Sequence, residues 1–203
     1  MELVSPLSGL KYPITMNNNE ATISSQEKKF AIEHLNRTGK AFVEAIQDFN
    51  EKQWYMRPGP GQWSAAECAQ HILETELYYF MPTVEKMLSE EPALARMAEA
   101  NGKDNSIIAG MENREYKIKG QPWEESSEKV IDREALIASF QAKRAENIVW
   151  LENSDGAFRA NFTEFPGMGT IDVYQFILFI SAHTTRHTGQ IQDIKDMEFS
   201  QSA

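Results

Sequence analysis

Apolar residues recur at helical spacing over four long stretches of this chain, whereas no stretch shows the apolar–polar alternation typical of a strand. The stretches run from Ser24 to about Glu51, from Ser64 to about Ser89, from Asp132 to about Leu151, and from about Ile171 to Lys195. A helix with one apolar side is stabilised by burying that side against other helices. The sequence therefore predicts an all-α fold, a four-helix bundle with a long connection between helices 2 and 3.

Local sequence marks several helix ends. Ser64-Ala-Ala-Glu67 has the pattern of a capping box, in which each side chain bonds the other residue's backbone amide. Asp132 suits the N-cap of the third helix. The run Arg57-Pro-Gly-Pro-Gly61 ends the first helical region, because proline and glycine disfavour helix continuation. Pro82 is expected to bend the second helix.

The length of 203 residues suits one domain with a full core. Residues 1–22 contain two prolines and no periodic pattern, so we expect a disordered leader followed by a single bundle domain over 23–200. Residues 90–130 are interrupted by prolines and glycines and are expected to hold one or two helical turns. A loop is expected around Pro166, Gly167 and Gly169. The connection over 90–130 either stays local or runs the length of the bundle, so the sequence leaves the helix order open.

Composition excludes several classes of partner and location. A net charge of −10 without a basic block makes nucleic-acid binding unexpected. The N-terminus lacks the basic and apolar regions of a signal peptide, and no apolar run approaches the roughly 20 residues that span a bilayer. A single cysteine, Cys68, excludes an internal disulfide and suits a reducing compartment. We therefore expect a cytoplasmic protein without membrane or nucleic-acid partners.

Two of the four histidines lie four residues apart in the last predicted helix. His183 and His187 share one helical face, and a helical wheel places them at the centre of its apolar side with Phe176, Ile180 and Ile194. Buried imidazoles without partners cost about 1–3 kcal/mol each. The pair is therefore either two hydrogen-bonded core residues or part of a metal site. Nearby Arg186 and Gln190 are placed to orient ligands or substrate.

His71 would supply a third nitrogen from the second helix. Its face carries Ser64, Glu67, Cys68, Thr75 and Tyr78, and is either solvated or the lining of a polar cavity in the bundle. Glu67 is explained by capping alone, and its second interpretation is a catalytic general base. Cys68 is expected to be a small buried apolar residue. His34 is expected on or near the surface.

Three neutral nitrogens suit zinc, nickel, iron or copper rather than calcium or magnesium, which prefer oxygen. Three protein ligands with an open fourth position are the arrangement of catalytic zinc sites. That position would hold a water of lowered pKa or a thiolate substrate.

The two histidine segments together resemble the DinB-like superfamily, also called the YfiT-like metal-dependent hydrolases. The resemblance covers about residues 25–197 and is carried by Arg57-Pro-Gly-Pro-Gly-Gln-Trp63-Ser64-Ala-Ala-Glu67-Cys-Ala-Gln-His71 and by His183-Thr-Thr-Arg-His187-Thr-Gly-Gln190. It implies a four-helix bundle in which His71, His183 and His187 bind a divalent metal, zinc or nickel in many members. It also implies a small-molecule substrate, in some members a low-molecular-weight thiol, and a homodimer.

Two functions remain open from the sequence. The first is a metal-dependent enzyme, either a hydrolase or a low-molecular-weight-thiol S-transferase. The second is a non-catalytic metal- or ligand-binding bundle. Metal content distinguishes them, and within the enzyme class the dependence of turnover on an added thiol separates transferase from hydrolase.

Overall fold

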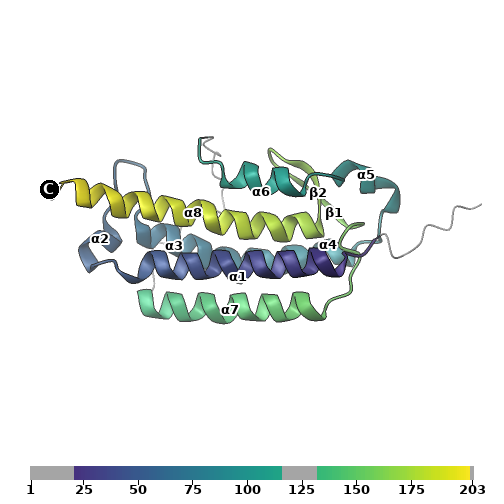
Figure 1. The fold of residues 1–203 in the computed structure, drawn as a ribbon, viewed down its shortest axis with the longest axis horizontal. Coiled ribbons are helices and arrows are strands. Elements are labelled where there is room, and N and C mark those ends of the chain that lie inside the picture. Colours follow the sequence, from purple (N-terminus) through teal and green to yellow (C-terminus); the bar gives the residue numbers. More distant parts are fainter. Residues whose placement is uncertain (1–20, 116–131, 202–203) are drawn as a thin grey trace, which may run out of the picture.

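The computed structural model describes residues 21–115 and 132–201 and confirms the predicted four-helix bundle (Figure 1). The expected leader thus falls almost wholly outside the described residues, as do residues 116–131 of the long connection. The first bundle helix is α1, and the third and fourth are α7 and α8. The second is a continuous rod of three segments, α3, η2 and α4. Their bounds are α1 Ser25–Gln47, α3 Ala65–Glu74, η2 Thr75–Phe80, α4 Met81–Ser89, α7 Arg133–Asn153 and α8 Val173–Gln201.

Contacts between the helices settle the order that the sequence left open. Lys28 near the start of α1 donates a hydrogen bond to Ser154 O at the end of α7, and Arg133 at the start of α7 donates one to Phe49 O just after α1. These two helices are therefore antiparallel. Hydrogen bonds join Tyr174 of α8 to Glu27 of α1, and Ser181 of α8 to His34 of α1. Both helices run in the same direction through these contacts, so α1 and α8 are parallel. The α3–α4 rod runs opposite to α1, as the chain colours in Figure 1 show. The second and third bundle helices are therefore parallel, and the chain must return along the bundle between them.

The long connection provides that return. It contains η3 (Leu94–Arg96), α5 (Met97–Ala100) and α6 (Asp104–Glu112), and α6 packs lengthwise on α8 (Figure 1). The sequence predicted one or two helical turns here, and the helical content is larger, since α6 alone has nine residues. Its buried residues, Ile107 and Met111, are four apart on one face. Two apolar positions in a segment that also contains glycine are too few to predict a helix from the sequence.

A β-hairpin replaces the predicted loop before α8. Strand β1 (Phe162–Phe165) pairs antiparallel with β2 (Gly169–Asp172), with Phe162 opposite Asp172. Gly167 and Gly169 have φ values of 81° and 69°, the left-handed region that glycine adopts without strain. Residues 166–168 form the turn, as the loop prediction expected, but Gly169 lies in β2 and the two strands were missed, because strands of four residues are too short for alternation to stand out in the sequence.

The predicted second helix contains a π-helical segment in place of a simple proline bend. Pro82 has no N–H and sits in the first turn of α4, directly after the π-helical residues Thr75–Phe80. A short helix, α2 (Glu51–Tyr55), also separates α1 from the Pro-Gly loop, so α1 ends four residues earlier than expected. The capping boxes at Ser24 and Ser64 and the Asp132 cap begin α1, α3 and α7.

His34 is buried, which corrects the expectation of a surface position. Only 5% of the residue is exposed, and its Nδ1 lies 2.5 Å from Ser181 Oγ on α8. The charged neighbours Glu33 and Arg37 are exposed, and this flanking pattern suggested solvent where the parallel packing of α1 on α8 places a buried polar contact.

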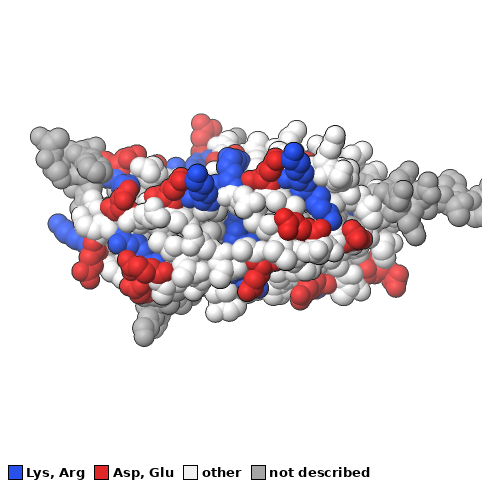
Figure 2. Space-filling view, turned by 60° about the horizontal axis from the view of Figure 1, so that its bottom comes forward, with Lys and Arg blue, Asp and Glu red and all other residues white. Residues whose placement is uncertain are grey.

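The outer surface carries mixed charge. Figure 2 shows acidic and basic side chains interspersed over one face rather than gathered into a patch of one sign. Among the described residues, no helix is both long and apolar enough to cross a membrane.

Candidate metal centre

The structure brings His71, His183 and His187 together inside the bundle. His71 lies on α3, which runs antiparallel to α8, so its side chain meets the pair from the facing helix. The Nε2 atoms of His71 and His183 are 3.1 Å apart, and those of His187 and His183 are 3.0 Å apart. Within the described residues this is the one group of three or more histidine, cysteine or acidic side chains with the spacing of a metal site.

All three imidazoles are buried, with 4% of His71, 8% of His183 and 9% of His187 exposed. Burial lowers the pKa of His71 to about 4 and that of His187 to about 3, and it lowers the pKa of His183 well below its usual value. Mutual repulsion between the rings acts in the same direction at His183 and His187. The rings are therefore neutral near pH 7, the state in which imidazole binds metals.

Gln190 selects the nitrogen that His187 presents to the cluster. His187 Nδ1 lies 2.6 Å from Gln190 Oε1, and a carbonyl oxygen accepts a hydrogen bond, so Nδ1 carries the proton. Nε2 then keeps its lone pair and points it at the other two rings. Second contacts of this kind orient metal-binding histidines in proteins.

The spacing fits a single small cation. Zn–N bonds of 2.0–2.1 Å in a tetrahedral site imply about 3.3 Å between ligand nitrogens. The observed separations of 3.0 and 3.1 Å are close to that value. Nitrogen lone pairs converging at this distance repel one another, and a divalent cation would turn the repulsion into coordination.

Trp63 closes the cluster on one side. Its ring lies 5.1 Å from the His71 ring and stacks 6.0 Å from that of His187, as centroid distances. Phe179 lies 5.9 Å from the His183 ring. Apart from its place in the recognised motif, Trp63 drew no attention in the sequence, although an aromatic residue directly before a helix cap is a feature that could have marked it.

Glu67 makes the contacts of a cap and an ion pair. Its carboxylate accepts from the Ser64 amide at 2.8 Å and from Arg57 Nε at 2.9 Å. Burial acts to raise the pKa of Glu67, but these hydrogen bonds outweigh it and the pKa is lowered. Glu67 is therefore ionised and engaged, and it anchors the loop that carries Trp63.

Three further residues near the cluster have distinct contacts. Cys68 is buried, and burial raises the pKa of its thiol to about 12, so it remains a neutral thiol. Gln190 is where the sequence placed it, beside the histidine pair. Arg186 instead donates to the backbone oxygens of Met111 and Asn113, which fastens the end of α6 to α8.

Comparison with known proteins finds a similar solved structure and a matching family model. YfiT from Bacillus subtilis, described as a probable metal-dependent hydrolase with an unusual four-helix bundle topology, superposes with a TM-score of 0.62. The match covers 94% of this chain and 95% of that one at 15% sequence identity, a level at which it shows a shared fold. No curated protein matches the chain. The family model of the DinB superfamily matches residues 34–191, which include all three clustered histidines, and the chain therefore belongs to that superfamily.

Proposed function

We propose that this protein is a metal-dependent hydrolase of a small molecule, with one divalent cation bound by Nε2 of His71, His183 and His187. The convergence of three neutral, buried imidazole nitrogens carries the proposal. The likeness to YfiT, described as a probable metal-dependent hydrolase, supports it. The all-nitrogen ligand set favours zinc or nickel over calcium or magnesium.

The residues around the cluster have different proposed roles. A divalent cation at three histidines lowers the pKa of a bound water towards neutral and so supplies a nucleophile. Gln190 holds the His187 ring in position through Nδ1. Trp63 and Phe179 place apolar rings against the histidines and keep bulk water from their faces. The neutral Cys68 thiol lies behind Gln190 and outside the ligand set.

For Glu67 we propose positioning as its main role. Its engaged carboxylate ties Arg57 to the start of α3, and this holds the loop that presents Trp63. Glu67→Gln should lower kcat by less than about tenfold and leave metal content unchanged. A loss of a hundredfold or more, with metal retained, would assign the carboxylate as the general base.

Metal content is the direct test. Wild-type protein loaded with zinc or nickel should hold about one equivalent per chain, and His187→Ala should hold none. His34→Gln is the matched control, because His34 is also a buried histidine on a bundle helix but lies outside the cluster. Failure of the folded wild-type protein to retain any divalent metal would refute the ligand assignment.

Turnover then separates the classes of function. A hydrolase cleaves ester or amide substrates when metal-loaded and needs no added thiol. Turnover seen only with a low-molecular-weight thiol would instead make the protein an S-transferase. Stoichiometric metal without turnover of any ester, amide or electrophile panel would favour a non-catalytic bundle.

A further inference from the structure

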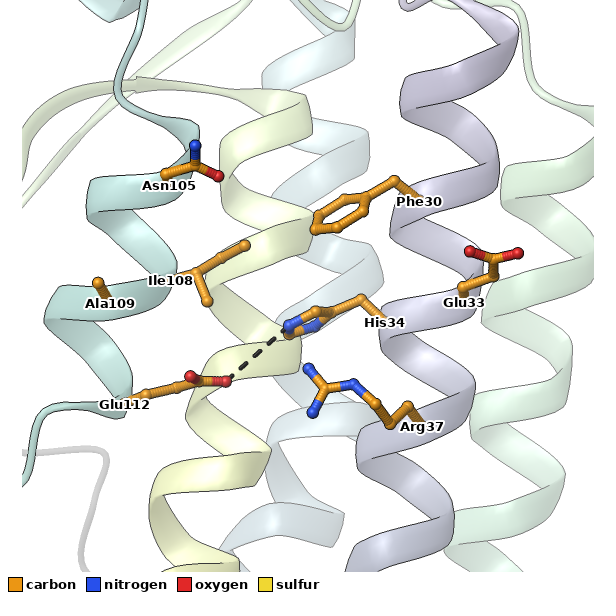
Figure 3. A pocket seen from close by; sticks show the side chains of 8 residues that line it. All are labelled: Phe30, Glu33, His34, Arg37, Asn105, Ile108, Ala109 and Glu112. Atoms are coloured by element: carbon orange, nitrogen blue, oxygen red, sulfur yellow. Dashed lines mark ion pairs between the residues drawn. The ribbon is translucent and has the colours of Figure 1, made fainter.

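A cavity separate from the histidine cluster lies between α1 and α6 (Figure 3). Its volume is about 470 Å³, within the range of small-molecule sites. One face of α1 contributes Phe30, His34 and Arg37, and the facing side of α6 contributes Ile108 and Glu112. None of the three clustered histidines lines it.

Hydrogen-bond contacts define which nitrogen His34 presents to this cavity. His34 Nδ1 lies 2.5 Å from Ser181 Oγ, which in turn lies 2.9 Å from Thr38 Oγ1. With Nδ1 held in this buried chain of contacts, Nε2 is the nitrogen that faces the cavity.

His34 Nε2 faces a carboxylate oxygen that lacks a hydrogen-bond donor. His34 Nε2 lies 3.9 Å from Glu112 Oε1, as the dashed line in Figure 3 marks, and this is too long for a hydrogen bond. Glu112 Oε1 is itself buried and has no hydrogen-bond partner. A donor placed about 2.8 Å from Glu112 Oε1 would satisfy this oxygen. A positively charged donor would also neutralise Glu112, which favours a primary ammonium group.

Arg37 provides the opposite charge at the same end of the cavity. Its guanidinium points toward His34 and Glu112 in Figure 3. Among the described residues it makes no ion pair, whereas its neighbour Glu33 pairs with Lys29. Guanidinium groups bind carboxylates with two parallel hydrogen bonds. The rest of the lining combines an apolar part, in which Phe30, 45% exposed, faces Ile108 and Ala109 across the cavity, with the polar side chains of Glu33 and Asn105.

We propose that this cavity binds an α-amino acid with an apolar or aromatic side chain. The ammonium group donates to Glu112 beside His34, the carboxylate pairs with Arg37, and the side chain packs on Phe30 and Ile108. An α-amino acid carries an ammonium and a carboxylate group next to each other and beside its side chain, and the cavity lining offers a partner for each of the three.

Calorimetric titration of the full-length protein with three probes tests the proposal. L-phenylalanine carries both charges, phenethylamine only the ammonium, and phenylpropionate only the carboxylate. L-phenylalanine should bind at one site and about tenfold or more tightly than either partial probe. Glu112→Gln and Arg37→Gln should each weaken it about tenfold. The α7 variants Lys143→Gln and Glu146→Gln, which lie outside the cavity and remove one charge of each sign, should leave it unchanged.

Because amino acids also chelate metals, the site of binding is checked in the His187→Ala variant. Affinity for L-phenylalanine should be retained there, since the cavity does not include the cluster. Loss of binding in His187→Ala, or full binding in both Glu112→Gln and Arg37→Gln, would overturn the proposal. Absence of saturable L-phenylalanine binding to the folded wild-type protein would also overturn it.

Discussion

His187 illustrates how one hydrogen bond prepares a side chain for metal. Its Nδ1 is committed to Gln190, one turn further along α8, so only Nε2 is available to the cluster. The two residues are three apart, a spacing that places them on the same helical face. The hydrogen bond that orients the ring is therefore built into a single helix.

Removal of that hydrogen bond should weaken metal binding without removing a ligand. Gln190→Ala is expected to lower metal affinity by about 10- to 100-fold, because the His187 ring loses the hydrogen bond that fixes its tautomer and its orientation. Competition with a chromophoric chelator measures the change. Gln192→Ala, which removes an exposed glutamine on the same helix, serves as the control and should bind metal normally. Equal affinities in both variants would show that Gln190 does not orient the ring.

Burial should make the site resistant to acid. A lowered pKa means that an imidazole takes up a proton only at more acidic pH, so protons compete with metal near pH 4 at His71 rather than near the usual 6.5. His187, with its pKa lowered to about 3, protonates later still. Metal content measured after dialysis over a pH series should therefore stay constant at pH 5.5 and fall towards pH 4. Release already complete at pH 6 would contradict the neutral, buried state of the rings.

At the scale of elements, the π-helical segment places an acid in the bundle core. Glu76 is 1% exposed and pairs with Arg144 of α7, which is 4% exposed. Arg144 also donates to Leu35 O on α1 and to Thr184 on α8. One guanidinium thus connects all four bundle helices at a level next to the metal cluster.

Breaking this pair should be costly. Arg144→Met leaves the Glu76 carboxylate buried with Asn147 as its remaining donor, and we expect a loss of about 3–5 kcal/mol in the free energy of unfolding. Urea denaturation measures it. Lys143→Met, which breaks the neighbouring exposed pair with Glu146, should cost less than about 1 kcal/mol. Similar losses in the two variants would mean that the buried pair adds no special stability.

At the scale of the whole molecule, a second arginine fastens the return connection to the bundle. Arg159 pairs with Glu27 on α1, Asp104 at the start of α6 and Asp172 at the end of the hairpin. Its guanidinium also lies 4.2 Å from the centre of the Tyr174 ring. The partners lie 132, 55 and 13 residues from Arg159 in the sequence, so one guanidinium joins α1, α6 and the hairpin.

Arg159→Met should therefore loosen α6 as well as reduce overall stability. We expect a loss of about 2 kcal/mol and faster amide hydrogen exchange over residues 104–112, because three carboxylates lose their shared cation. Arg96→Met is the control, since Arg96 makes comparable ion pairs at exposed positions. Unchanged exchange in α6 would show that its packing on α8 alone holds it.

Much of this structure follows from local sequence. The caps at Ser64 and Asp132 locate helix starts because a cap needs only residues one turn apart. The apolar stripe of α8 placed His183 and His187 on its buried side for the same reason. The hairpin and α6 escaped prediction because each is short and is stabilised by distant partners, α6 by α8 and the hairpin by Arg159 and α5.

The sequence by itself determined the helices, the family motif and the three histidines that the proposed metal site uses. Only the tertiary structure decided that the second and third bundle helices are parallel, that His34 is buried beside a cavity, and that Glu67 anchors a loop. The reason is physical. Helical periodicity and caps depend on neighbours within one turn, whereas burial, helix direction and the partners of a side chain depend on contacts between segments far apart in the chain.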